Sequence, residues 1–501
     1  MASFEKDGEL LQLLREKLTH HEVQEASVSD PSQKFMLRKQ IEELRSQISD
    51  LEWPTVGQGR GGPLSVGSRE PEAVNVYVTR LEISNIRCIP HLAIDFPEGS
   101  DRWVMFLGNN ASGKTTLLRS LALGLCNALD AAAMIKDIPG NVLQEGASEG
   151  FVEVHMRRSL DGAELRIRTS ILRDPESGSE TIQQDKTPAR GFPWNDIFVC
   201  GYGTQRSAQA RSSSDHYSPL NALRTLFSDQ ASLQNPEVVL LRQSRTERRL
   251  IEQRLLSVLM LDESVSSISS GDEGLTVRGP WGTTPLFSLS DGYRSTAQWV
   301  IDYIGWQIHA DRFDFDNGSG GILLIDELEQ HLHPRWQRQI VQRLRRQFPT
   351  TQIFSTTHTP LVAAGVVDLD DAMIVRLEKE DEEITAHIVD KEKLKGKRAD
   401  QILASEAFGL VTSRTPGSTD DLNRYVELLN KDVTEDEREE RDALAKRLEE
   451  NIVFGENEFE QTVERAVRET LEKLLGDALG PEHILETKRQ LSELFHAETS
   501  E

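Results

Sequence analysis

Hydrophobic and polar positions follow a strand-like pattern from residue 74 onward. Apolar residues alternate with polar ones or run together in VNVYVTRLEIS, HLAIDF, WVMFLG, FVEVHMRRS, AELRIRTSIL and DIFVCGYG, and such short runs predict β-strands. A Leu-rich helical pattern covers 117–129, another helical stretch covers 216–262, and a second series of strands and helices runs from 286 to 390. Strands that alternate with helices indicate an α/β fold. We therefore predict an α/β domain at 74–390, in which 206–288 contain a short helical arm insertion.

The segments on either side have helical patterns. After Asp30-Pro31, which is typical of a helix start, apolar residues repeat at spacings of 4, 3, 4 and 3. They are Leu37, Ile41, Leu44, Ile48 and Leu51. This seam is short for a free coiled coil, so a helix packed on its own domain is favoured over a zipper between chains. We predict N-terminal helices at 1–53, a Gly/Pro-rich linker at 54–73, and an acidic helical C-terminal region at 391–501.

Composition and charge restrict the function classes. The 501-residue chain has a formal net charge of -25, which argues against a wholly basic protein that coats DNA. It has neither an apolar run long enough to span a membrane nor a signal-peptide pattern. Its cysteines are the single, scattered Cys88, Cys126 and Cys200. We expect a cytoplasmic protein, in which these cysteines are ordinary buried residues.

The stretch FLGNNASGKTT, between a predicted strand and a predicted helix, has the pattern GxxxxGK[ST]. Its residues are Gly108, Asn109, Asn110, Ala111, Ser112, Gly113, Lys114 and Thr115, followed by Thr116. In such a loop glycines let the backbone N–H groups face phosphates, the lysine reaches the β- and γ-phosphates, and the threonine hydroxyl binds Mg²⁺. Because the pattern also occurs by chance, further motifs are needed to support an ATP site.

Acidic residues and a histidine follow two later strands. GILLIDELEQHLHP is a buried-strand pattern that ends in Asp326 and Glu327. An aspartate there is placed to hold Mg²⁺, and the glutamate after it is placed to orient the attacking water. Without a phosphate loop earlier in the chain, the same pair would be interpreted as two surface acids at a strand end. IFSTTHTP, one strand later, ends at His358. A lone histidine is usually structural, but this position favours a contact with the γ-phosphate.

Two further loops have residues that suit a nucleotide site. GYGTQRS follows a predicted strand, and its Gln205 is placed to reach Mg²⁺ and water. LSDGYRS precedes a long helical pattern, so Ser290 and Gly292 put a hydroxyl and a bare backbone at a helix N-terminus. A helix N-terminus binds anions readily, because its first N–H groups have no partner in the helix.

The order GNNASGKT, YGTQ, LSDG, ILLIDE and STTH resembles the ABC-type ATPase heads of the SMC/RecF/OLD superfamily over roughly residues 74–390. The resemblance implies a P-loop NTPase fold, ATP hydrolysis, and ATP and Mg²⁺ as cofactors. Its implied roles are Lys114 and Thr115 for phosphate and Mg²⁺, Gln205 as the Q-loop residue, Ser290 and Gly292 as the signature loop, Asp326 as the Walker B aspartate, Glu327 as the catalytic glutamate and His358 as the switch histidine.

The same resemblance implies an assembly. The signature loop of one copy completes the ATP site built on Lys114 and Asp326 of another, giving a homodimer or a higher oligomer. Asp291 stands where transporter signatures usually have glycine, so a transporter subunit is disfavoured.

The insertion of 206–288 is too short for the long coiled coils of SMC proteins, and it has no CxxC. An acidic DxD cluster, as in OLD nucleases, has its nearest match in VDLDD at 367–371, within a predicted loop. His331 and His333 lie in the HLHP segment after the acidic pair, where a dimer-facing structural role is favoured over a metal pair. We therefore expect no nuclease activity of its own.

The segment KGKRADQILASEAFGL, after the head, resembles the corresponding segment of the PtuA ATPases of the Septu anti-phage system. Those ATPases work with a separately encoded HNH nuclease. The leading hypothesis is therefore an ATP-hydrolysing dimeric switch that senses nucleic acid and regulates an effector, an HNH-type nuclease in antiviral defence. One alternative is a RecF-like DNA-repair ATPase that acts on DNA junctions. Another is a scaffold that binds ATP and turns it over slowly.

Arginines of the predicted arm are candidates for nucleic-acid contacts. They are Arg242, Arg245, Arg248 and Arg249, and arginines on such an arm are well placed for phosphate backbones. The alternative is a solvated helix in which Glu247 and Glu252 pair with these arginines. The arginines of the helix after the acidic pair are expected to be mostly structural.

Overall fold

The computed structural model describes residues 75–208, 216–261, 267–271, 274–313, 320–380, 383–409, 416–429 and 434–451. The chain divides into two units, Met1–Glu70 and Pro71–Glu501, and every described residue belongs to the second. The predicted N-terminal helices at 1–53 and the linker at 54–73 lie outside the described residues, so both stay predictions.

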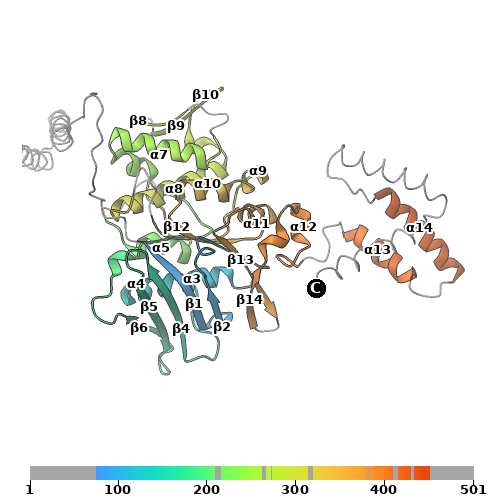
Figure 1. Ribbon diagram of the computed structural model, residues 1–501, viewed down its shortest axis with the longest axis horizontal. Coiled ribbons are helices and arrows are strands. Elements are labelled where there is room, and N and C mark those ends of the chain that lie inside the picture. The colour runs from blue at the N-terminus through green and yellow to red at the C-terminus, as the bar shows by residue number, and fades with distance from the viewer. Residues whose placement is uncertain are drawn as a thin grey trace, which may run out of the picture. The chain divides into compact units, whose positions relative to one another are not determined.

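A six-stranded sheet in the order β14-β13-β3-β12-β11-β7 forms the centre of the described domain (Figure 1). Its strands are β3 (Trp103–Leu107), β7 (Val199–Tyr202), β11 (Gly321–Ile325), β12 (Thr351–Thr357), β13 (Ala372–Glu380) and β14 (Glu383–Val389). All are parallel except β14, which pairs antiparallel with β13 at the edge. The carboxyl ends of β3, β7, β11 and β12 therefore meet at one edge, where ligands bind in sheets of this kind.

The two faces of this sheet carry separate hydrophobic cores. In β3, Trp103, Met105 and Leu107 face one core, while Val104 and Phe106 face the other. The first core is closed by α8 (Asp291–His309), α10 (Ile340–Gln347) and α11 (Pro360–Val367), and the second by α3 (Lys114–Gly124). Because every residue of β3 is buried, the run WVMFL is apolar without alternation, as is usual for a strand covered on both faces.

A second, antiparallel sheet in the order β2-β1-β4-β5-β6 covers the other side of α3. Its strands are β1 (Val76–Ile86), β2 (Ile89–Asp95), β4 (Glu149–Arg158), β5 (Glu164–Arg173) and β6 (Glu180–Thr187). The helix packs closely on this sheet, because a Cβ at Gly124 would lie 2.4 Å from Cγ2 of Val154. The edge strand β6 is not predicted from the sequence, because its residues ETIQQDKT are almost all polar.

The predicted helix at 117–129 is wrong in its length, because two helices occupy this stretch. The first, α3, ends at Gly124, and α4 (Ala128–Asp137) begins after three intervening residues. The side chain of Asn127 accepts hydrogen bonds of 3.0 Å from the N–H groups of Leu129 and Asp130. This cap starts a new helix where the apolar pattern alone predicts a continuous one.

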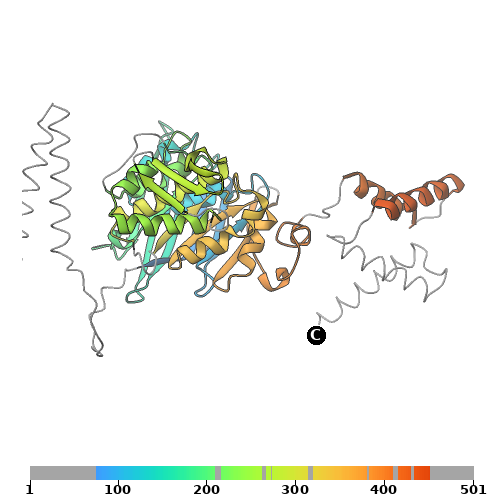
Figure 2. The same ribbon diagram turned by 90° about the horizontal axis from the view of Figure 1, so that it is seen from above.

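The arm is only partly helical. Its helices are α5 (Pro219–Phe227), α6 (Pro236–Leu241) and α7 (Arg245–Val258), and they are followed by a three-stranded antiparallel sheet of β8 (Ser267–Gly271), β9 (Gly274–Gly279) and β10 (Gly282–Pro285). Buried Glu252 of α7 holds this sheet, since it accepts hydrogen bonds from the backbone N–H (2.8 Å) and hydroxyl (2.7 Å) of Ser270. Seen from above, α7 lies on the side of the domain formed by α8 and α10, which it contacts (Figure 2).

Where the structure describes the region after residue 390, it consists of helices joined by turns, such as those at 395–398 and 404–409. The helical region predicted at 391–501 extends beyond the described residues and as a whole stays a prediction. It has a short 3-10 turn at Lys391–Leu394, α12 (Ala399–Leu403), α13 (Pro416–Leu429) and α14 (Glu435–Asn451). Two 2.9 Å hydrogen bonds from Arg424 to Glu440 join α13 to α14. The remaining helix is α9 (Pro334–Gln337), and further 3-10 turns lie at Trp194–Asp196 and Leu286–Ser288. Among the described helices, none has both the length and the apolar character that crossing a membrane requires.

Candidate active site

The loop after β3 wraps tightly around the N-terminus of α3. Gly108 has φ 155°, and a Cβ there would lie 2.4 Å from Oγ of Ser112 and 2.5 Å from the carbonyl oxygen of Leu377. Gly113, at the N-cap of α3, has φ 87° and offers no capping side chain. The first N–H groups of α3 therefore keep their capacity to bind an anion. The glycines stand where the sequence pattern requires them.

Lys114 places a buried cation beside this loop. Its side chain is 6% exposed, and Nζ donates 2.8 Å hydrogen bonds to the carbonyls of Gly108 and Asn109. Burial lowers the pKa of Lys114, while the nearby carboxylates of Asp326 and Glu327 act in the opposite direction. Its close partners here are neutral oxygens, so its charge is suited to bind phosphate.

Asp326 lies at the end of β11 and accepts hydrogen bonds from two hydroxyls. Thr115 donates to Oδ2 (2.7 Å) and Thr356 donates to Oδ1 (2.6 Å). Asp326 is buried, at 2% exposure. A threonine hydroxyl next to a carboxylate is a donor set that fits Mg²⁺, which prefers oxygen ligands. Thr115 and Asp326, predicted as metal ligands, are thus brought together from positions far apart in the sequence.

Glu327 is held in an uncommon backbone conformation at the same edge. Its φ is 49°, in the left-handed region, and its N–H donates to Oγ1 of Thr356 at 2.8 Å. The Glu327 side chain is 39% exposed, and its Oε1 lies 3.8 Å from Nε2 of His358. The two predicted catalytic side chains therefore lie next to each other, and water can reach the carboxylate.

Two residues that the sequence analysis misses support this geometry. Arg206 is buried and donates to the carbonyls of Gly203 (2.7 Å), Asp326 and Glu327 (2.9 Å). Burial lowers the pKa of its guanidinium to about 10, while Asp326 and Glu329 oppose that shift. Glu329 accepts a 2.5 Å hydrogen bond from the N–H of His358. The one sequence signal close to Arg206 is its neighbour Gln205. For Glu329 the signal is its place as the last acid of the run DELE, which begins with Asp326 and Glu327.

Gln205 is exposed, and within the described residues it makes no hydrogen bond. No contact to Thr115 or Asp326 therefore supports its predicted contact with Mg²⁺, which stays a prediction.

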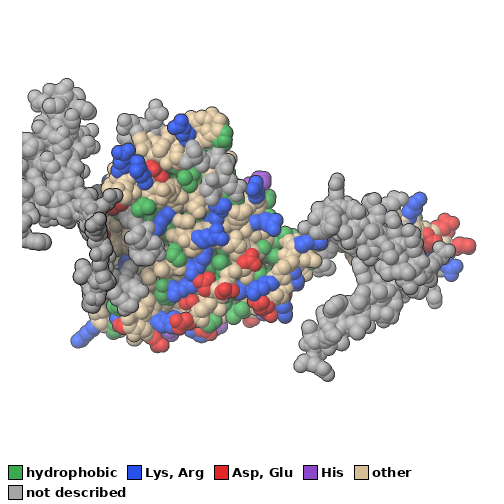
Figure 3. Space-filling view, turned by 45° about the horizontal axis from the view of Figure 1, so that its top comes forward, with side chains coloured by type: hydrophobic (Ala, Val, Ile, Leu, Met, Phe, Trp, Pro, Cys, Tyr) green, Lys and Arg blue, Asp and Glu red, His purple; other side chains and the backbone are tan. Residues whose placement is uncertain are grey.

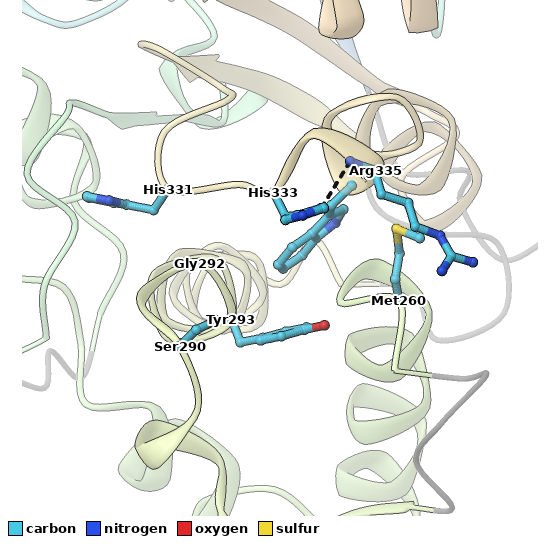
Figure 4. A pocket seen from close by; sticks show the side chains of 8 residues that line it. Met260, Ser290, Gly292, Tyr293, His331, His333 and Arg335 are labelled. Atoms are coloured by element: carbon cyan, nitrogen blue, oxygen red, sulfur yellow. Dashed lines mark hydrogen bonds between the residues drawn. The ribbon is translucent and has the colours of Figure 1, made fainter. Parts of the chain in front are cut away.

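The predicted signature loop lies at the start of α8, in a different cavity. Ser290 occupies the N-cap position, is exposed, and makes no capping hydrogen bond with its side chain. Gly292 is required by the adjacent HLHP loop, because a Cβ there would lie 2.5 Å from the carbonyl oxygen of His331. Figure 4 shows Ser290 and Tyr293 on one side and the two histidines on the other. The cavity has a volume of about 270 Å³ and is lined by Met260, Ser290, Gly292, Tyr293, His331, His333, Arg335 and Trp336.

No phosphate-loop residue is among the described residues that line this cavity. The structure therefore does not bring Ser290 and Gly292 together with Lys114 in one chain. Nδ1 of His333 accepts the N–H of Arg335 at 3.2 Å (Figure 4). In the described part of the chain, no group of three or more His, Cys, Asp or Glu side chains is arranged to hold a metal ion. VDLDD occupies the predicted loop between α11 and β13, where Asp371 pairs with Arg345.

Three of the four candidate arginines are exposed on the arm. They are Arg242, Arg245 and Arg249, whereas Arg248 is half-buried and donates to the carbonyl of Gln243 (3.2 Å). The glutamates that could have paired with them are engaged elsewhere: Glu247 caps α7 with Ser244, and Glu252 binds Ser270. Lys and Arg side chains are visible over this side of the molecule in Figure 3. In contrast, Arg343 of α10 donates to the carbonyl of Ser257 (2.6 Å) and is structural, as expected.

The residues of this site lie within a part of the chain that matches the model of a known family. The model of a family described as "AAA domain, putative AbiEii toxin, Type IV TA system" matches residues 104–364. Septu protein PtuA of Bacillus mycoides (strain KBAB4) is 29% identical over 399 residues, which are 77% of this chain and 53% of that protein. The chain thus spans about half the length of that relative. The resemblance to Septu ATPases expected from the sequence is confirmed.

Two further known proteins are similar to this chain, one over a shorter segment and one at lower sequence identity. Retron Vc95 probable ATPase of Vibrio cholerae serotype O1 biovar El Tor is 47% identical over 83 residues, which are 16% of each protein. The solved SMC head domain from Thermotoga maritima has 13% identity and a TM-score of 0.38, and the match covers 63% of this chain and 99% of that one.

Proposed function

Because the chain belongs to the family described as "AAA domain, putative AbiEii toxin, Type IV TA system", we propose that it is a dimeric switch that binds and hydrolyses ATP and thereby regulates a separate effector. The observation that carries the proposal is the set of hydrogen bonds from Thr115 to Asp326, from Thr356 to Asp326 and from Glu327 to Thr356. It joins the loop around Lys114 to the predicted metal ligand Asp326 and to the predicted catalytic residue Glu327.

Each residue then has a defined task. The N–H groups at the start of α3 and the ammonium of Lys114 bind the phosphates. Thr115 and Asp326 would hold Mg²⁺, which neutralises phosphate charge when bound. The exposed carboxylate of Glu327 orients the attacking water and accepts its proton. His358, whose N–H is fixed by Glu329, contacts the γ-phosphate.

The assembly follows from the position of the signature loop. The side chain of Ser290 makes no capping hydrogen bond to α8, and Lys114 is not among the described residues that line the cavity beside it. We propose that they complete the ATP site of a second copy, where the helix N-terminus stabilises the γ-phosphate charge.

The effector proposal is supported by the relatives. A protein named for the Septu system matches 77% of the chain, and a protein named as a retron ATPase matches a shorter part. We propose a role in antiviral defence, with an HNH-type nuclease as the regulated partner.

Single-turnover hydrolysis by the Glu327→Gln variant tests the proposed reaction. Glutamine keeps the shape of the side chain but cannot accept the proton of water, so the rate is expected to fall about 100-fold or more. ATP binding is expected to be retained, because the substitution removes none of the groups proposed to bind the phosphates or Mg²⁺. Glu176→Gln, an exposed acid in the turn before β6, is the matched control and should keep the wild-type rate. A Glu327→Gln rate within a few-fold of wild type would show that another residue orients the water.

The arm is proposed to bind nucleic-acid backbone. Arg245→Glu combined with Arg249→Glu is expected to weaken binding of labelled DNA and RNA regardless of sequence. Two lost phosphate contacts should lower the slope of log affinity against log salt by about 2. The control reverses two other exposed cations, Lys136 and Arg190, with the same change in net charge. Fluorescence anisotropy across a salt series measures both, and equal losses in the two double variants would exclude a specific role of the arm.

A further inference from the structure

A buried carboxylate joins α8, the signature helix that begins at Ser290, to β7. This strand pairs with β11, which ends directly before Asp326. Asp302 lies in α8 and is 2% exposed. Its Oδ2 accepts the hydroxyl hydrogen of Tyr202 at 2.8 Å, and its Oδ1 accepts the N–H of Gln234 at 2.7 Å. Burial raises the pKa of Asp302 to about 6, and these hydrogen bonds oppose that shift. An acid in the core is costly unless its hydrogen bonds are satisfied, so the geometry of its donors is fixed closely.

Tyr202 connects this carboxylate to Asp326 and Glu327. It is the last residue of β7, and its carbonyl accepts the N–H of Asp326 at 2.9 Å. Four residues later, Arg206 donates to the carbonyls of Asp326 and Glu327. Residues 202–206 therefore hold the backbone of both acids, and the hydroxyl of Tyr202 holds 202–206 to α8.

Gln234, a residue of the arm, contacts the same carboxylate of Asp302. It stands two residues before α6, which packs on α8. A Cβ at Gly305 of α8 would lie 3.2 Å from Nε2 of Gln234, so the absence of a side chain there allows the close approach. The single carboxylate of Asp302 thus joins three parts of the molecule: the signature helix that carries it, the strand before Arg206, and the segment between α5 and α6 of the arm.

We propose that Asp302 is a positioning residue for ATP hydrolysis, which fixes the signature helix relative to Asp326 and Glu327 through the hydroxyl of Tyr202. This inference rests on the proposed function. In a composite site the signature loop of one copy must meet Asp326 and Glu327 of another. A shift of α8 relative to β7 therefore misaligns the phosphate and the attacking water. It removes no group that touches ATP. The expected defect is therefore in turnover and not in binding.

Tyr202→Phe tests the inference, because it deletes only the linking hydroxyl. We expect kcat to fall about 10- to 100-fold while the Kd for ATP stays within about 2-fold of wild type. The matched control is Tyr303→Phe. Tyr303 is also buried, lies next to Asp302 on α8, and bonds through its hydroxyl to Oγ1 of Thr351 (3.0 Å). Its loss should lower the melting temperature similarly and leave kcat close to wild type.

Asp302→Asn provides an independent variant of the same contact. If both residues act through one hydrogen bond, the double variant Tyr202→Phe/Asp302→Asn should lose no more turnover than the more affected single variant. A Tyr202→Phe kcat no lower than that of Tyr303→Phe, or fully additive losses in the double variant, would overturn the positioning role alone. A wild-type protein without ATP turnover, or a Glu327→Gln variant with normal turnover, would instead overturn the proposed function on which it rests.

Discussion

Replacing Lys114 with alanine is expected to weaken ATP binding by about 100-fold or more. Lys114 is the cation nearest the loop carbonyls of Gly108 and Asn109, and each charge-assisted hydrogen bond to a phosphate that is lost costs about 1.5–3 kcal/mol. Two such bonds correspond to roughly two to four powers of ten in affinity. Anisotropy of a fluorescent ATP analogue, checked by calorimetry, measures the change.

The control for this variant is Lys136→Ala, which removes an exposed lysine from the last turn of α4. Both variants remove one positive charge, so an effect of net charge alone would appear in both. Because Lys114 is buried, thermal unfolding of the variant must be compared with that of the wild type. A folded Lys114→Ala protein with wild-type affinity would remove the assignment of the phosphate loop.

The positions of the site residues could be predicted from the sequence where a residue directly follows a recognisable strand. Gly108 follows the buried run WVMFL, and Asp326 follows the buried run GILLI. Because these strands are parallel in the sheet and separated only by β12, their carboxyl ends bring both motifs to one edge. Thr115, Asp326, Glu327 and His358 therefore lie together as the order of motifs indicates.

Arg206 was not predictable, because its role depends on contacts between distant parts of the chain. Two of its three partners are backbone carbonyls about 120 positions away in the sequence, and a backbone carbonyl leaves no trace in the identity of the residue that carries it. The same holds for Asp302, which in a helical pattern resembles a polar interruption of an apolar face. Its partners, Tyr202 and the N–H of Gln234, are set by the packing of α8 on β7 and α6.

The missed strands have a different cause. In β6 and β10 polar side chains occupy both faces, so the alternation that indicates a half-buried strand is missing. Only Leu275 and Val277 of β9 give such a signal in the arm sheet. Pairing with β5 and β9 forms β6 and β10 where local preference does not, and the hydrogen bonds of Glu252 to Ser270 hold β8 of the arm sheet.

Mixing two inactive variants should restore ATP hydrolysis. Lys114→Ala disables the phosphate loop. Ser290→Arg puts a long side chain at the start of α8, where the serine makes no capping hydrogen bond that the helix would lose. In a two-fold symmetric dimer, a mixed pair has one composite site with both lesions and one with neither. Free exchange at equal concentrations makes half of the dimers mixed, so roughly a quarter of the wild-type rate should return.

Two measurements make this result interpretable. Differently tagged chains, purified through both tags, establish that mixed dimers have formed. Sizing of the Glu327→Gln protein with and without ATP shows separately whether bound ATP stabilises a dimer. This is expected because ATP would lie between the two copies in the proposed assembly. Neither measurement depends on turnover, so each remains informative if the two sites of a dimer are coupled.

The rate of ATP hydrolysis by the purified mixed dimers tests the central claim most directly. The claim is that Lys114 and Asp326 of one copy work with Ser290 and Gly292 of another. It predicts that dimers of Lys114→Ala with Ser290→Arg chains recover about half of the wild-type rate per dimer, since one of their two sites is intact. Dimers that carry both tags and stay as inactive as either parent, beside a Glu327→Gln protein that stays monomeric with ATP, would contradict it.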